Sequence, residues 1–327
     1  MPEDYAYLNA RIRCRRSRLL HDGFFGEALS LSLPELVKVL SESVYGPDLT
    51  GSSLADVDRA VRAHFNRTVG DLPRLVSGTV REAVTLILLR ADLANVKTIL
   101  RGRAIGRPPA EIMDQLGEGT LPQGLYQTMV EAGDAASLGQ VLALSKHPLT
   151  RALREASRAG GEPLEVEVNL DRTFYTAVFI RARRLDQPYL ARFFGFELDT
   201  LNLSVGLRLF ALGVEGRPER FFLEGGGVVS LALFQRLARG DVAGLEELEG
   251  TDLGRVSEAE DLQELERGLR CALLAKAHEC SKDVLGAGLA LDYIQRKRWE
   301  AGRIRLLARR ALYDLPRASV EKEMVCE

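Results

Sequence analysis

The 327-residue sequence contains little of what catalytic and metal-binding sites are usually built from. It has four cysteines, one tryptophan and only 6% aromatic residues, and its histidines, His21, His64, His147 and His278, are far apart. No two cysteines have CxxC spacing, and no HExxH, GxSxG or strand-following GxGxxG motif is present. We therefore predict that the protein is not an enzyme, has no catalytic, cofactor-binding or metal-binding residues, and uses no cofactor.

One group of cysteine and histidine residues has the composition of a zinc site, because Cys271, His278 and Cys280 lie within ten residues of one another. On a helix, positions 271 and 278 share a face, whereas position 280 is turned by about 200° from position 278. Three zinc ligands cannot converge from those directions. The pattern predicts buried thiols and an exposed histidine.

The sequence also lacks the features of a membrane-spanning or exported chain. The longest uncharged run in its most apolar part, Ala83 to Leu89, has seven residues, and a spanning helix needs about 20. The first residues include no basic stretch followed by an apolar one, as a signal peptide would. The net charge of −2 gives no overall attraction to nucleic acid or to an anionic membrane. We expect a soluble intracellular protein with no nucleic-acid partner and no small-molecule substrate.

What the sequence does contain is one short pattern in three copies. An acid is followed by Asn or Arg at the third position, an aliphatic residue at the fourth and Arg at the ninth. The copies are Asp92, Asn95, Val96, Arg101; Asp199, Asn202, Leu203, Arg208; and Glu300, Arg303, Ile304, Arg309. The acids are 107 and 101 residues apart (199 − 92 and 300 − 199). We predict three domains, 1–107, 108–217 and 218–327.

The sequence around each copy of the pattern indicates helices. Leu-rich runs punctuated by charges, with few alternating β-branched stretches, favour helix over strand. An apolar helix candidate precedes each copy, at 82–90, 188–196 and 284–294, and a proline follows each copy, in 106–108, 216–218 and 315–317. Because proline stops a helix from continuing, these segments predict the helix ends. The predicted fold class is all-α.

The spacing within the pattern places its apolar residues on one face. From Asp92 that face carries Val96 and Ile99, and from Glu300 it carries Ile304 and Leu307. We expect the acid near the start of its helix and the arginine near the end, where the helix dipole favours each charge. The pattern is therefore interpreted as helix-terminal and ion-pair positions that hold a repeated packing arrangement.

Two further features leave alternatives open. The glycines Gly225 to Gly227 could form a phosphate-cradling loop, but no Lys or Ser/Thr partner accompanies them, so a flexible turn is favoured. Residues 294–317 carry eight basic side chains, and residues 241–266 carry ten acids. These charges indicate either helix faces paired with each other or a basic partner surface.

Several segments carry a resemblance that runs from end to end. The segments on which it depends are Tyr7 to Arg11, Val69 to Val76, Leu265 to Cys271, Leu306 to Arg310, and Val325 with Cys326. Through them the chain resembles the C subunit of the bacterial and archaeal V-type (A/V-type) rotary ATPase and ATP synthase, which is related to the d subunit of the vacuolar proton pump.

The resemblance implies a funnel of three similar helical domains around a pseudo-threefold axis. It implies a non-catalytic rotor subunit of the central stalk, with the central shaft subunits and the membrane proteolipid ring as partners, peripheral on the cytoplasmic face of the plasma membrane. Such a subunit would link proton-driven rotation to ATP synthesis or hydrolysis. The alternative from the residues alone is a helical scaffold that binds an acidic partner through Arg296, Lys297, Arg298, Arg303 and Arg305.

Overall fold

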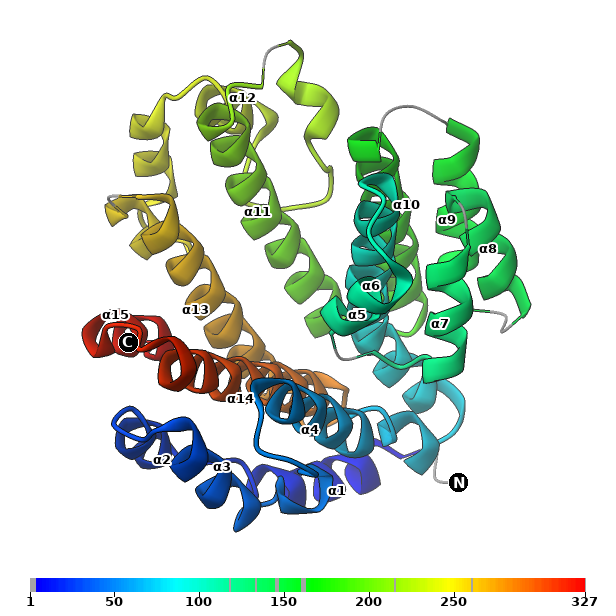
Figure 1. Cartoon of the computed structure of the whole chain (residues 1–327). Helices are drawn as coiled ribbons and strands as arrows, with labels where there is room; N and C mark the ends of the chain where they lie inside the picture. Colours follow the sequence, from blue (N-terminus) through cyan, green and yellow to red (C-terminus); the bar gives the residue numbers. More distant parts are fainter. Residues whose placement is uncertain are drawn as a thin grey trace. The chain divides into compact units, whose positions relative to one another are not determined.

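The structure is a computed structural model, and it describes residues 4–117, 119–132, 134–144, 147–159, 163–214, 216–259 and 261–326. Every regular element within these ranges is a helix, and none of the described residues forms a strand (Figure 1). The all-α fold class is therefore confirmed. Within the same ranges, each helix is too short or too polar to span a lipid bilayer.

The α-helices vary from seven to 27 residues in length. They are α1 (Tyr5–Arg16), α2 (Asp22–Ala28), α3 (Leu33–Ser41), α4 (Leu54–Thr68), α5 (Gly78–Ala104), α6 (Pro109–Gln115), α7 (Gln123–Glu131), α8 (Ala135–Leu144), α9 (Leu149–Ala159), α10 (Pro163–Arg184), α11 (Pro188–Ala211), α12 (Leu231–Leu237), α13 (Leu262–Cys280), α14 (Gly288–Tyr313) and α15 (Arg317–Met324). The 3₁₀ turns are η1 (Gly46–Asp48), η2 (Leu72–Leu75), η3 (Pro218–Phe221), η4 (Val242–Leu248) and η5 (Gly254–Glu258).

Each copy of the repeated pattern lies inside one long helix, α5, α11 or α14. The apolar segment before the copy belongs to the same helix, because no proline separates it from the acid. Asp92, Asp199 and Glu300 consequently stand about three to four turns into their helices. The prediction of an acid near the helix start is therefore wrong, and the helix dipole cannot stabilise these charges.

The long helices end before the prolines, as predicted, but a left-handed residue makes each turn. Gly106, Gly213 and Asp314 have φ of 69°, 62° and 51°. The amide that follows each of them donates to a carbonyl near the helix end: residue 107 to 102, 214 to 209, and 315 to 310. This is the usual way in which a left-handed residue satisfies the last carbonyls of a helix.

The chain divides into two compact units, one made of residues 1–84 and 277–327 and the other of residues 85–276. In the first unit, α14 contacts α1, α2, α3, α4 and α15. Its buried face, Ala301, Ile304 and Leu307, forms one core with residues of α2, α3, α4 and α15 such as Phe25 and Leu36. The predicted apolar face of the third copy is thus confirmed, and the N-terminal and C-terminal segments share a core.

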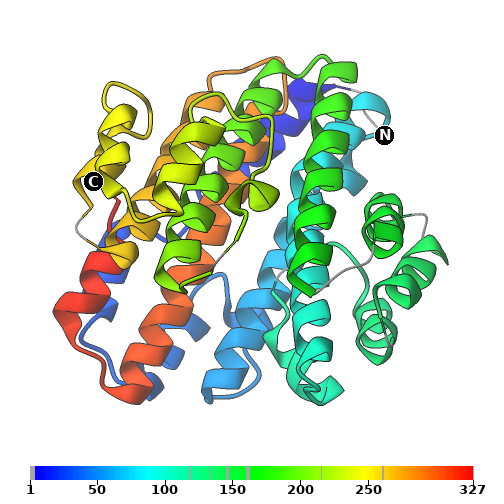
Figure 2. The ribbon, with the colours of Figure 1, turned by 90° about the horizontal axis from the view of Figure 1, so that it is seen from above.

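In the second unit, the short helices α7, α8 and α9 gather beside α10 (Figures 1 and 2), and α9 contacts both α8 and α10. The helix α11 packs on α12, where Leu203 and Leu207 join a core with Phe234 and Leu237. Gly206 allows this approach, because a Cβ at that position would lie 3.4 Å from atoms of Phe234 and Leu237.

Candidate functional site at three buried acids

The acids of the three copies are almost completely buried, with exposed fractions of 0% for Asp92, 1% for Asp199 and 1% for Glu300. A buried carboxylate costs several kcal/mol unless hydrogen bonds or an opposite charge compensate it. The partners of these acids therefore decide what the repeated pattern does.

Asp92 binds the segment between α6 and α7. Its oxygens accept hydrogen bonds from the Thr120 amide at 2.7 Å, from the Thr120 hydroxyl and from the Tyr126 hydroxyl at 2.7 Å. The His147 Nε2 atom lies 3.3 Å from the same carboxylate. Burial acts to raise the pKa of Asp92, but the bonds from His147 and Thr120 outweigh it and lower the pKa below its ordinary value.

Asp199 binds the glycine-rich segment before α12. Its carboxylate accepts hydrogen bonds from three successive amides, Gly227 at 2.9 Å, Val228 at 3.0 Å and Val229 at 2.8 Å. A Cβ on Gly226 would lie 2.1 Å from Asp199 Oδ1, so only glycine leaves room for the carboxylate. Burial raises the pKa of Asp199, and the three amides oppose this shift.

The glycines Gly225 to Gly227 lie in a turn, as expected, and the amides of this segment bind a carboxylate of the same chain. Successive amides that point to one centre form an anion-binding concavity. Here the bound anion is the protein's own Asp199 carboxylate. The sequence could not reveal this, because the carboxylate lies almost thirty positions earlier in the chain.

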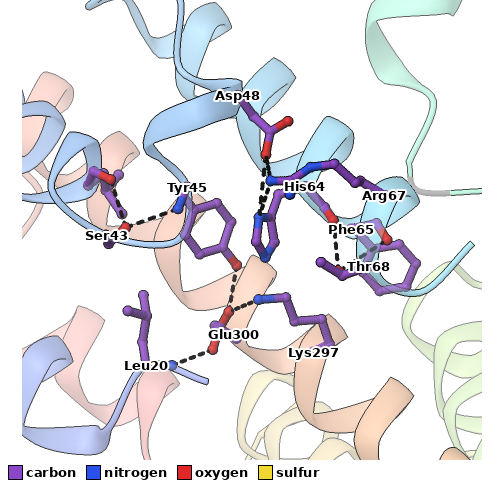
Figure 3. A network of polar contacts seen from close by, with 11 residues as sticks. Leu20, Ser43, Tyr45, Asp48, His64, Phe65, Arg67, Thr68, Lys297 and Glu300 are labelled. Carbon is purple, nitrogen blue, oxygen red and sulfur yellow. Dashed lines mark hydrogen bonds and ion pairs between the residues drawn. The ribbon is translucent and has the colours of Figure 1, made fainter. Parts of the chain in front are cut away.

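Glu300 binds the N-terminal part of the chain (Figure 3). Its carboxylate accepts from the Leu20 amide at 2.7 Å and from the Tyr45 hydroxyl at 2.6 Å, and it pairs with the Lys297 ammonium group. Lys297 is itself only 2% exposed. Burial lowers the pKa of Lys297, while Glu300 acts to raise it.

The polar network of the first unit continues from Tyr45 to His64, whose rings lie 4.3 Å apart (Figure 3). His64 Nδ1 lies 3.2 Å from the Arg67 guanidinium and 3.4 Å from Asp48. Burial, followed by the positive charges of Lys297 and Arg67, lowers the pKa of His64 to about 4. His64 is therefore neutral near pH 7, where its Nδ1 accepts a hydrogen bond from Arg67.

The side chain at the third position of the pattern contacts the same segments as the acid does. Asn95 Oδ1 accepts from the Gly117 amide at 2.8 Å. Asn202 exchanges two hydrogen bonds with the backbone of Leu223, at 2.9 and 3.0 Å. In the third copy, the arginine at this position pairs with Asp22 at 2.7 Å.

The ninth position carries an arginine that pairs with an acid on a neighbouring helix in every copy. The pairs are Arg101 with Glu167 of α10, Arg208 with Glu266 of α13, and Arg309 with Asp58 of α4. The ion-pair part of the interpretation from the sequence is thus confirmed for these arginines.

Together these contacts have a cyclic order along the chain. The helices α5 and α11 each bind the loop and the helix that come after them, whereas α14 binds segments from the beginning of the chain. The third copy therefore finds its partners about 250 to 280 positions away. We call this repeated set of contacts the clasp of each long helix.

The charged stretches pair with other parts of the same chain. Within residues 294–317, Arg296 pairs with Asp292, and Arg305 lies 3.3 Å from Asp58. Within residues 241–266, Asp252 pairs with Lys276 at 2.7 Å. These contacts favour paired helix faces over a basic partner surface.

The cysteine and histidine cluster is as expected only in part. Cys280 is a buried free thiol and the His278 side chain is exposed, but Cys271 is half-buried and disulfide-bonded, so the prediction of a buried thiol at Cys271 is wrong. Among the described residues, no three His, Cys, Asp or Glu side chains are placed to hold a metal ion. A groove of about 610 Å³ on α8 and α9 includes His147 and Arg151, and none of the three buried acids lines it.

Comparison with known proteins decides the family. The family model described as "ATP synthase (C/AC39) subunit" matches residues 8–323. The chain belongs to this family. It is 48% identical to the C subunit of the V-type ATP synthase of Thermus thermophilus over all of both chains. It is 30% identical to the corresponding V-type protein of Deinococcus radiodurans, over 99% of this chain and 92% of the relative.

The family includes archaeal members as well. The C subunit of the A-type ATP synthase of Halorubrum lacusprofundi is 27% identical over 98% of this chain and 97% of the relative. The resemblance noted from the sequence is therefore confirmed. As a member of this V-type ATP synthase family, the chain is a structural, non-catalytic subunit.

Proposed function

We propose that this chain is the rotor subunit of the central stalk that couples the central shaft to the membrane proteolipid ring, so that proton-driven rotation is linked to ATP synthesis or hydrolysis. In this role it lies peripherally on the cytoplasmic face of the plasma membrane. Its three helical domains, 1–107, 108–217 and 218–327, form a funnel around a pseudo-threefold axis.

The cyclic order of the clasps is the observation that supports this proposal most. The long helix of each proposed domain binds a segment of the next domain, and the last one binds the first. An arrangement of three equivalent parts around an axis requires such closure. Buried carboxylates with fixed partners also resist deformation, since moving a loop away would leave a buried charge unsatisfied. A part that transmits torque needs this stiffness.

The proposal is tested by assembling the ATP synthase in sealed vesicles with and without this chain. With the chain present, ATP hydrolysis is expected to drive proton uptake. Without it, the soluble head should still hydrolyse ATP, but proton uptake should be absent because no part connects head and ring. Coupled proton uptake in its absence would show that the chain does not perform the coupling.

The alternative of a scaffold for an acidic partner finds little support in the contacts. Of its five proposed basic residues, Lys297 is buried, and Arg296, Arg303 and Arg305 pair with acids of the same chain. A partner would have to displace these pairs before it could bind.

A further inference from the structure

A large apolar side chain at or directly after the last residue of each long helix is exposed to water. Ile105 is 66% exposed, Leu212 is 76% exposed and Tyr313 is 64% exposed. All three stand thirteen positions after the acid of their copy (105 − 92, 212 − 199 and 313 − 300). The left-handed residue of the helix end follows directly in each case. We call these three positions the helix tips.

The tip of α11 extends into a larger apolar surface, which includes Phe210 at 52% exposed and Val214 at 38% exposed. The Phe210 ring lies against Gly240, where a Cβ would be only 2.4 Å from it. Val242, 56% exposed, comes two positions after that glycine.

A free arginine accompanies each tip. The guanidinium groups of Arg107, Arg217 and Arg317 make no ion pair or hydrogen bond within the part of the chain that the structure describes. Each of them lies at most five positions after its tip residue. The arginines at the ninth position of the pattern, in contrast, all pair with acids. The tips therefore combine exposed apolar surface with arginines that form no ion pair among the described residues.

We propose that the tips of α5 and α11, both in the second unit, dock on the anionic phospholipid surface of the membrane, with the apolar side chain in the interfacial layer and the arginine at the phosphate groups. Apolar side chains flanked by basic ones are the chemistry by which peripheral proteins bind anionic bilayers. This inference rests on the proposed function, which places the chain beside a membrane. Each tip is small, so binding depends on the tips of α5 and α11 acting together.

The test uses the purified full chain and its co-sedimentation with vesicles of phosphatidylcholine, with or without phosphatidylglycerol. Binding is expected only with phosphatidylglycerol, and it should weaken as salt is added. The variants Leu212→Ser and Ile105→Ser should each bind roughly tenfold more weakly, from the loss of interfacial apolar burial. The variant Arg217→Gln should bind anionic vesicles more weakly and lose part of the salt dependence.

The matched control is Ile180→Ser. Ile180 is 65% exposed on α10, in the same unit as Ile105 and Leu212, but it lies on the side of a helix and not at a tip. This variant should bind vesicles as the original chain does, and far-UV circular dichroism verifies that all variants are folded. Equal binding to neutral and anionic vesicles, or an equal loss in the control, would overturn the proposal.

A further binding measurement distinguishes lipid from protein as the partner of the tips. If the tip variants bind anionic vesicles normally but fail to bind the purified ring in detergent, the tips contact protein loops and the lipid proposal is wrong. That outcome leaves the coupling function intact, because proton uptake in the vesicle assay with the original chain reports on coupling separately.

Discussion

The glycine loop around Asp199 allows a sharp test of the clasp. Removing the carboxylate and crowding it should each lower the free energy of unfolding, and the two losses should not be additive. In Asp199→Ala, three amides lose their acceptor, and Val229 is itself buried. Each bond to a charged acceptor contributes about 1.5–3 kcal/mol, and water that enters the space recovers part of the loss. On this basis we expect the free energy of unfolding to fall by about 3 kcal/mol.

The variant Gly226→Ala should destabilise nearly as much by a different route. Its Cβ would lie 2.1 Å from Asp199 Oδ1, and the nearest atoms around it all belong to the Asp199 side chain. The carboxylate would have to leave its three amides. In Asp199→Ala the methyl group of Ala at position 226 has no carboxylate to clash with. The double variant Asp199→Ala/Gly226→Ala should therefore be about as stable as Asp199→Ala alone. The expected interaction energy is roughly 2 kcal/mol.

Gly227 supplies the matched control, because a Cβ there would meet no atom within 4 Å. Gly227→Ala should therefore change stability by less than about 0.5 kcal/mol. The measurement is urea unfolding followed by circular dichroism, with the melting temperature as a second readout at about 2–4 °C per kcal/mol. If Gly226→Ala proved as stable as Gly227→Ala, or if the two losses simply added, Asp199 would not hold the loop.

Three further predictions concern the first unit. His64 has a pKa of about 4 when folded and an ordinary value of 6.5, so between these values the unfolded chain binds more protons and stability falls as pH falls. Urea unfolding from pH 7 to pH 4.5 should show a loss of about 2 kcal/mol, and His64→Gln should remove it; an unchanged slope would refute the assignment. Glu300→Gln leaves the buried Lys297 ammonium without its counter-charge, so we expect a loss of about 3 kcal/mol, largely recovered by adding Lys297→Met; urea unfolding that finds the double variant weaker than the single one would contradict this. Asp314→Gly should raise the free energy of unfolding by about 0.5 kcal/mol, because Asp314 has φ of 51° where the other two copies have glycine; thermal unfolding would show a lowered melting temperature if this is wrong.

The sequence could predict the helical fold class, the number of copies and the buried face of each, since these depend on residues a few positions apart. Val96 and Ile304 are buried because helical periodicity places them beside the acid of their copy. The same local logic misplaced Asp92 and Glu300, because it assigned them to a helix start that would have needed a cap or a break in the preceding apolar segment.

The sequence by itself determined the all-α fold class, the helical character of the three pattern copies, where their helices end and which family the chain resembles. Only the tertiary structure decided what the repeated polar residues bind. Asp199 faces amides that follow it by almost thirty positions, and Glu300 faces Leu20 and Tyr45 across most of the chain. A carboxylate can accept a hydrogen bond from any backbone amide, so residue type carries no information about the partner. Packing chooses the partner, because burial leaves each acid with only the donors that the fold brings to it.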